Sequence, residues 1–155
     1  MKKTFVIFTF LLVSLPSLCF AEQGKHSFGM GLGPTYNGLG INYRIPTTYF
    51  SNYLSIGCPT IGYGTGSGFI GRCGIGYSLL KTITPNRRHG LGTNLGISYA
   101  KYAVENGQSN HIGIFYAYYF NNEETTGWNI QFGPAIEYFD QEYFRNIYLG
   151  FGYQY

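Results

Sequence analysis

Alternation of large apolar residues with small or polar ones, at a period of two, is the feature that most constrains this chain. The last ten residues show it most clearly, with apolar side chains at every second position: Ile147, Leu149, Phe151, Tyr153 and Tyr155. This is the period of a β-strand that has one apolar face, and no helical periodicity replaces it between residues 22 and 155. The alternation therefore predicts an all-β fold.

Eight segments of the chain show this alternation, and we expect each to be a strand. Their approximate bounds are 26–36, 39–47, 53–63, 69–80, 91–104, 111–120, 128–139 and 146–155. The dipeptide Asn37-Gly38 between the first two segments indicates a two-residue hairpin, because a type I′ turn needs positive φ at both positions. A fold at this point predicts that Leu32 pairs with Tyr43 and Met30 with Ile45.

The first 21 residues have the features of a secretory signal peptide. Two lysines precede an apolar run from Phe5 to Leu15, and Ala21 is a small residue at the expected cleavage site. The run is shorter than the roughly 20 apolar residues of a transmembrane helix. We therefore expect Sec-type export and one domain, residues 22–155.

The composition is unusual for a soluble domain. Aromatic residues make up 19% of the chain and charged residues 11%, with 23 glycines, whereas a soluble domain is about 25% charged. Without Lys2 and Lys3, the ten basic residues fall to eight against seven acidic ones, so the charge gives no reason to expect a nucleic-acid partner. Residues 22–155 also contain no apolar run of helix length, so a place in a membrane would require a closed barrel.

The two faces of the expected strands differ in the way that distinguishes membrane barrels from soluble ones. One face carries the large apolar residues and almost no charge. The opposite face carries twelve glycines, at positions 29, 31, 33, 40, 74, 76, 92, 96, 113, 133, 150 and 152, together with Asn42, Arg44, Arg72, Ser78, Asn94, Ser98, Gln131 and Glu137. Soluble barrels place their apolar face inside, whereas transmembrane barrels turn it toward lipid. The pattern predicts an eight-stranded antiparallel up-and-down transmembrane barrel.

The last strand, with its aromatic terminal residue, resembles the assembly signal of Gram-negative outer-membrane β-barrel proteins. The strand count resembles their small eight-stranded OmpA/OmpX-type class. This resemblance implies recognition of the last strand by the barrel-assembly machinery, both termini in the periplasm, and outer-membrane lipid and lipopolysaccharide as surroundings. We expect a monomer.

Two cysteines, Cys58 and Cys73, remain after the expected cleavage. A fold at residues 64–68 pairs Tyr63 with Phe69, and one bulged residue near Pro59 then brings Cys58 opposite Cys73. In an oxidising periplasm this pairing predicts a cross-strand disulfide, and two separate small hydrophobic thiols are the alternative. The spacing and the distance from any histidine predict no metal site.

The glycine-rich interior admits two interpretations. Arg44, Arg72 and Glu137 can satisfy one another as a buried charge network that fills the lumen, because unpaired charges are very costly there. The glycines can alternatively leave a slot for a lipid tail or a small hydrophobic ligand. We expect no cofactor.

Ser109, His111 and Glu105 are the candidate catalytic residues, since a serine, a histidine and an acid can activate a hydroxyl for acyl transfer. Some small outer-membrane barrels are lipid A deacylases or acyltransferases, but their His-x-Ser order is reversed here. The main hypothesis is a non-enzymatic membrane protein with a structural or ligand-binding role. The alternatives are a lipid A-modifying enzyme and a secreted soluble carrier of the lipocalin type.

Overall fold

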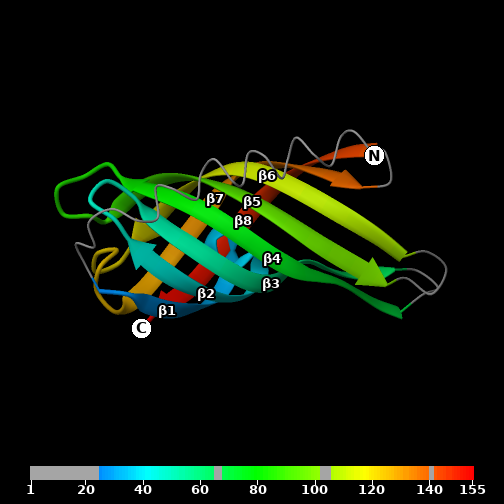
Figure 1. The fold of residues 1–155 in the computed structure, drawn as a ribbon, viewed down its shortest axis with the longest axis horizontal. Coiled ribbons are helices and arrows are strands. Elements are labelled where there is room, and N and C mark those ends of the chain that lie inside the picture. Colours follow the sequence, from blue (N-terminus) through cyan, green and yellow to red (C-terminus); the bar gives the residue numbers. More distant parts are fainter. Residues whose placement is uncertain (1–24, 65–67, 102–105, 140–141) are drawn as a thin grey trace.

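In a computed structural model, the chain forms a closed antiparallel β-barrel in which strands adjacent in sequence pair and β8 closes on β1 (Figure 1). The structure describes residues 25–64, 68–101, 106–139 and 142–155. The elements are β1 (Ser27–Gly33), the 3-10 helix η2 (Pro34–Tyr36), β2 (Gly38–Pro46), β3 (Ser51–Gly64), β4 (Gly68–Thr82), β5 (His89–Lys101), β6 (Asn106–Tyr119), β7 (Gly127–Phe139) and β8 (Glu142–Gln154). The predicted all-β, eight-stranded up-and-down barrel is confirmed.

The two ends of the barrel hold different connections. We call the end that holds the β1–β2, β3–β4, β5–β6 and β7–β8 connections the hairpin end. The opposite end, where β1 begins and β8 finishes, is the terminal end. No helix within the described residues is long and apolar enough to cross a membrane.

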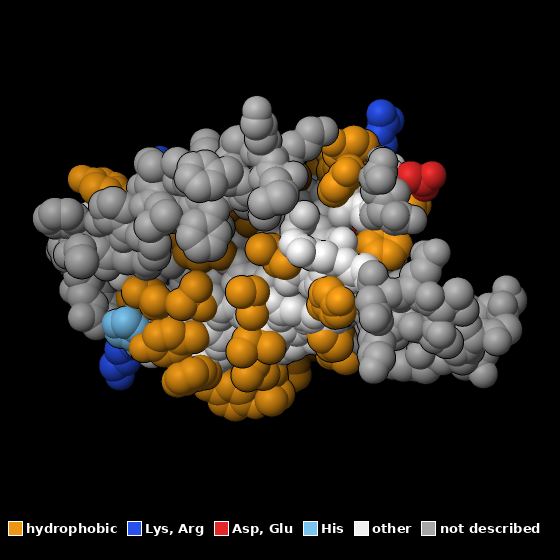
Figure 2. Space-filling view, turned by 45° about the vertical axis from the view of Figure 1, so that its right-hand side comes forward, with side chains coloured by type: hydrophobic (Ala, Val, Ile, Leu, Met, Phe, Trp, Pro, Cys, Tyr) orange, Lys and Arg blue, Asp and Glu red, His pale blue; other side chains and the backbone are white. Residues whose placement is uncertain are grey.

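The predicted assignment of faces is confirmed. Large apolar side chains on the strands are exposed on the outside, among them Phe28, Met30, Leu39, Ile41, Ile56, Ile75, Leu95, Ile97, Ile114, Phe132, Leu149 and Phe151. Figure 2 shows hydrophobic side chains across the coloured part of one face, with the charged side chains at its margins. The buried inward side chains are mostly polar, among them Asn42, Arg44, Ser78, Asn94, Ser98, Gln131 and Glu137.

The predicted register of the first hairpin is wrong. Leu32 pairs with Leu39 and Met30 with Ile41, so each residue of β1 meets a partner four positions earlier than expected. The reason is that the chain leaves β1 at Gly33 and forms a 3-10 turn that begins at a proline, whose fixed φ suits the start of a helical turn. Because the shift is an even number of residues, the apolar side chains still face outward.

The predicted register of β3 and β4 is confirmed. Tyr63 pairs with Phe69, and the ladder shifts between Gly57 and Thr60, as expected for a bulge near Pro59. Cys58 and Cys73 form a disulfide. The bridge therefore joins the two strands where the bulge interrupts their ladder.

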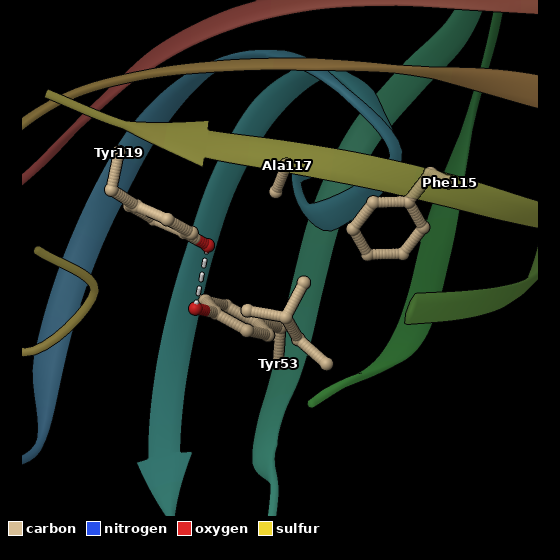
Figure 3. Packing of buried hydrophobic residues seen from close by; sticks show 5 residues of the cluster. Tyr53, Phe115, Ala117 and Tyr119 are labelled. Atoms are coloured by element: carbon tan, nitrogen blue, oxygen red, sulfur yellow. Dashed lines mark hydrogen bonds between the residues drawn. The ribbon is translucent and has the colours of Figure 1, made fainter. Parts of the chain in front are cut away.

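A small hydrophobic cluster fills the barrel toward the terminal end. It consists of Tyr53, Leu80, Phe115, Ala117 and Tyr119, all almost completely buried. Figure 3 shows the rings of Tyr53 and Tyr119 facing each other, joined by a hydrogen bond of 3.0 Å between their hydroxyl groups. The interior at this end is packed with side chains, as expected for a barrel of eight strands.

Candidate functional site

The connection between β1 and β2 folds into the barrel. We call residues Pro34–Asn37 the inward turn; all four are buried. Asn37 ends the turn with φ 54° and ψ 51°, a left-handed conformation that asparagine tolerates well. The central lumen is thus occupied by the chain's own backbone, a filling that the sequence analysis did not predict.

Hydrogen bonds from several strands hold the inward turn in place. Thr35 N donates to Gln131 Oε1 at 3.1 Å, and Gln131 Nε2 donates to Thr35 Oγ1 at 2.7 Å. Asn129 Nδ2 donates to the Tyr36 hydroxyl at 2.8 Å. On the other side, Ser78 Oγ donates to Pro34 O and Asn42 Nδ2 to Thr35 O. Hydrogen bonds from strands β2, β4 and β7 therefore hold the inward turn inside the lumen.

The inward-facing glycines make room for this turn. A Cβ on Gly57 would lie 2.2 Å from Tyr36 O, and a Cβ on Gly40 would lie 2.5 Å from the same atom. A Cβ on Gly152 would lie 2.4 Å from the Tyr36 ring. These distances are shorter than any side chain tolerates, so glycine is needed for the close approach of the turn to the wall.

An ion pair closes the terminal end of the barrel. Arg44 Nη1 lies 3.6 Å from Glu123 Oε1 and donates to Glu123 O at 2.7 Å, and both side chains are buried. The Tyr53 hydroxyl donates to Glu123 Oε1 at 3.0 Å. Glu123 belongs to the β6–β7 connection, so this contact ties that connection across the barrel mouth. Sequence reasoning missed Glu123 because no local pattern identifies a turn residue that folds inward.

The described contacts do not include the side chain of Arg72, so they do not test the predicted network of Arg44, Arg72 and Glu137 as a whole. Arg44 pairs with Glu123 and also donates to Ser27 Oγ and Lys25 O. Glu137 accepts a hydrogen bond of 3.3 Å from Asn146 Nδ2. The side chain of Arg72 lies outside the described residues, and its pairing stays a prediction.

A second polar group of side chains lies on the hairpin side of the inward turn. We call His111, Glu137, Asn146 and Tyr148 the His111 cluster. His111 and Glu137 are register partners on β6 and β7. The His111 ring meets the Tyr148 ring edge-on, with centroids 5.9 Å apart. These four residues could offer hydrogen-bond donors and acceptors to a polar group in the lumen between the inward turn and the hairpin end.

Several buried polar atoms in the interior have no hydrogen-bond partner among the described residues. They are Asn37 Oδ1, Asn42 Oδ1, Ser55 Oγ, Asn94 Nδ2, Asn94 Oδ1 and His111 Nδ1. Buried polar atoms usually bind a protein group or ordered water. A Cβ on Gly96 would meet both the His111 ring and Asn37 Oδ1, so His111 lies close to the last residue of the inward turn.

The structure places two of the three candidate catalytic residues near each other. Ser109 and His111 both point inward from β6 and are buried. The Ser109 hydroxyl bonds with Ser98 Oγ at 2.7 Å, and no hydrogen bond to His111 is present among the described residues. Glu105 lies outside the described residues, and the carboxylate opposite His111 is that of Glu137. The arrangement lacks the nucleophile–base hydrogen bond that acyl transfer needs.

No group of three or more His, Cys, Asp or Glu side chains that could hold a metal ion occurs within the described ranges. Comparisons with protein-family models, with curated proteins and with solved structures give no match.

Proposed function

We propose that this chain is an integral β-barrel protein of the bacterial outer membrane, exported by its first 21 residues, with a non-enzymatic role. The observation that carries the proposal is the outward, exposed position of the apolar residues on strands whose inward face is polar. A soluble barrel would expose this surface to water, where large apolar patches cause association. In a membrane, the same apolar surface lies against lipid acyl chains, which is the arrangement of transmembrane barrels.

The filled interior supports a role other than that of a channel or carrier. The inward turn and the small hydrophobic cluster that contains Tyr53 occupy the lumen. The ion pair of Arg44 and Glu123 closes the terminal end. An apolar carrier needs an apolar cavity, whereas the lumen here is lined mostly by polar side chains. We propose that the barrel stabilises the envelope or binds a ligand at its hairpin end.

The apolar last strand fits assembly by the outer-membrane machinery. Ile147, Leu149, Phe151 and Tyr155 are exposed on the outside, so the last strand keeps the alternating apolar pattern that resembles the assembly signal. Tyr155 N also donates to Phe28 O at 2.7 Å, which joins the end of the chain to the first strand. Termini in the periplasm then place the hairpin end outside the cell.

Fractionation and gel mobility test the proposal. We expect the protein in the outer-membrane fraction, extractable only with detergent, and we expect its mobility to shift when the sample is boiled. A closed barrel keeps its hydrogen-bonded wall in mild detergent and unfolds on heating, which changes its shape in the gel. Recovery as a soluble periplasmic protein without a shift would refute the proposal and favour the carrier alternative.

A further inference from the structure

The barrel wall is incomplete at the hairpin end. Strands β1 and β2 have 7 and 9 residues, whereas β3 to β8 have 13 to 15. β1 pairs with β8 only from Gly29 to Leu32, opposite Gln154 to Phe151. The remainder of β8, Glu142–Leu149, pairs with β7 but has no partner on its other edge among the described residues. In Figure 1 the long strands continue past the ends of β1 and β2.

This gap has defined borders, and we call it the notch. One border is the Glu142–Leu149 edge of β8. The other is β3 beyond Cys58, because β2 pairs with β3 only as far as Leu39 and Cys58. The floor is the inward turn, which folds inside instead of extending the wall. The disulfide joins β3 to β4 at the point where β3 loses β2, so it holds this border of the notch together.

The interior can be reached from the side through the notch. The inward-facing residues of β8 below the notch, Gly150, Gly152 and Gln154, are buried. Those of the same parity beside the notch are not: Tyr148 and Asn146 are half-buried, and Phe144 is 43% exposed. This exposure begins at the level where β1 ends and stops pairing with β8.

The notch combines an apolar border with unsatisfied polar groups. Ile147 and Leu149 are 78% and 72% exposed on the outside of β8. The His111 cluster lies on the inside. Within it, the buried Nδ1 of His111 has no hydrogen-bond partner among the described residues. The free strand edge adds backbone N–H and C=O groups, which are costly to leave unpaired in lipid. An acyl chain with an ester group matches this combination. The acyl chain would cover Ile147 and Leu149, and the ester carbonyl would accept hydrogen bonds from the β8 edge or the His111 cluster.

We infer that the notch admits one acyl chain of a lipid from the surrounding leaflet, with its ester region against the β8 edge and the His111 cluster. This inference rests on the proposed membrane location. A second copy of the chain is a poorer occupant. Copies in one membrane are related by an axis along its normal, so two β8 edges tilted by about 35–45° would cross at about twice that angle and could not pair.

Fluorescence quenching by brominated lipid tests the inference. The native Trp128 is first replaced by Phe, and the reporter Tyr148→Trp is then introduced at the inward-pointing position beside the notch. The protein is folded into phosphatidylcholine vesicles with or without bromine on the acyl chains, and a mobility shift on boiling verifies folding. Phe132→Trp is the outward control, and Phe115→Trp is the buried inward control with 1% exposure.

We expect the bromine-dependent loss of fluorescence at position 148 to approach that at position 132 and to exceed that at position 115. If Tyr148→Trp does not fold, Phe144→Trp takes its place, because that inward-pointing side chain is already exposed. Quenching at 132 but not at 148 or 144 would overturn the lipid notch and leave the membrane proposal intact. Absence of quenching at 132 would overturn both.

Discussion

Replacement of Glu123 by alanine tests the closure of the terminal end. The change leaves the Arg44 guanidinium buried without its carboxylate, and breaking a buried pair in this way costs about 3–5 kcal/mol. Arg44 keeps its hydrogen bonds to Ser27 Oγ, Lys25 O and the Glu123 carbonyl, which reduces the loss. The Tyr53 hydroxyl loses an acceptor, which adds about 1 kcal/mol. Together these effects should lower the free energy of unfolding by about 3 kcal/mol, the lower end of the range for a broken buried pair.

Urea unfolding in detergent micelles, followed by fluorescence, measures this loss. With a slope of about 2 kcal/mol per molar urea, the midpoint should fall by about 1.5 M. The matched control is Glu124→Ala, because Glu124 is the next residue and pairs with Arg87 at the exposed surface; exposed pairs contribute about 0–1 kcal/mol. Equal midpoints for Glu123→Ala and Glu124→Ala would refute the reasoning. A second test repeats Glu123→Ala in a protein that already carries Arg44→Met. If Glu123→Ala lowers the free energy of unfolding there by as much as in the native protein, the reasoning is also refuted.

Three further changes test the interior, the disulfide and the catalytic candidate. Gly57→Val should prevent folding, because its Cβ would lie 2.2 Å from the carbonyl of the inward turn, whereas Gly127→Ala, which meets only a flexible side chain, should fold and shift on boiling. Cys58→Ser opens a cross-link of about 15 residues and should lower the free energy of unfolding by about 3 kcal/mol; an equal urea midpoint for the variant and the oxidised protein would contradict this. Ser109→Ala should leave the lipid A profile of cells unchanged, and a changed profile would restore the enzymatic alternative.

Most of the wall could be predicted from the sequence because strand pairing obeys a strict period of two. Apolar residues at alternate positions indicate which face is outward, and this held wherever the structure describes the side chains of a strand. The β3–β4 register followed from one turn and one bulge at a proline, and the disulfide followed from that register. These predictions depend only on neighbours along a strand or across a turn; the first hairpin, predicted in the same way, has a different register because its turn begins at Pro34.

Predictions about the interior could not be made at the same level. Asn37-Gly38 was a correct indication of a turn, but Pro34 starts that turn earlier and directs it inward. The partner of Arg44 was expected on a strand and lies in the β6–β7 connection, 79 residues away. Neither contact has a local pattern, because both join residues that are distant in the chain and meet only when the barrel closes.

The sequence alone determined that this protein is a barrel, because its segments alternate at the period of a strand, and the glycines and polar residues of one face indicated that the apolar face lies outside. The tertiary structure decided what fills that barrel. The seven residues of β1 are too few to complete the wall. The turn that follows β1 lies where the glycines of β2, β3 and β8 leave space. Whether a hairpin extends the wall or plugs the lumen depends on that space, which exists only after all eight strands have paired.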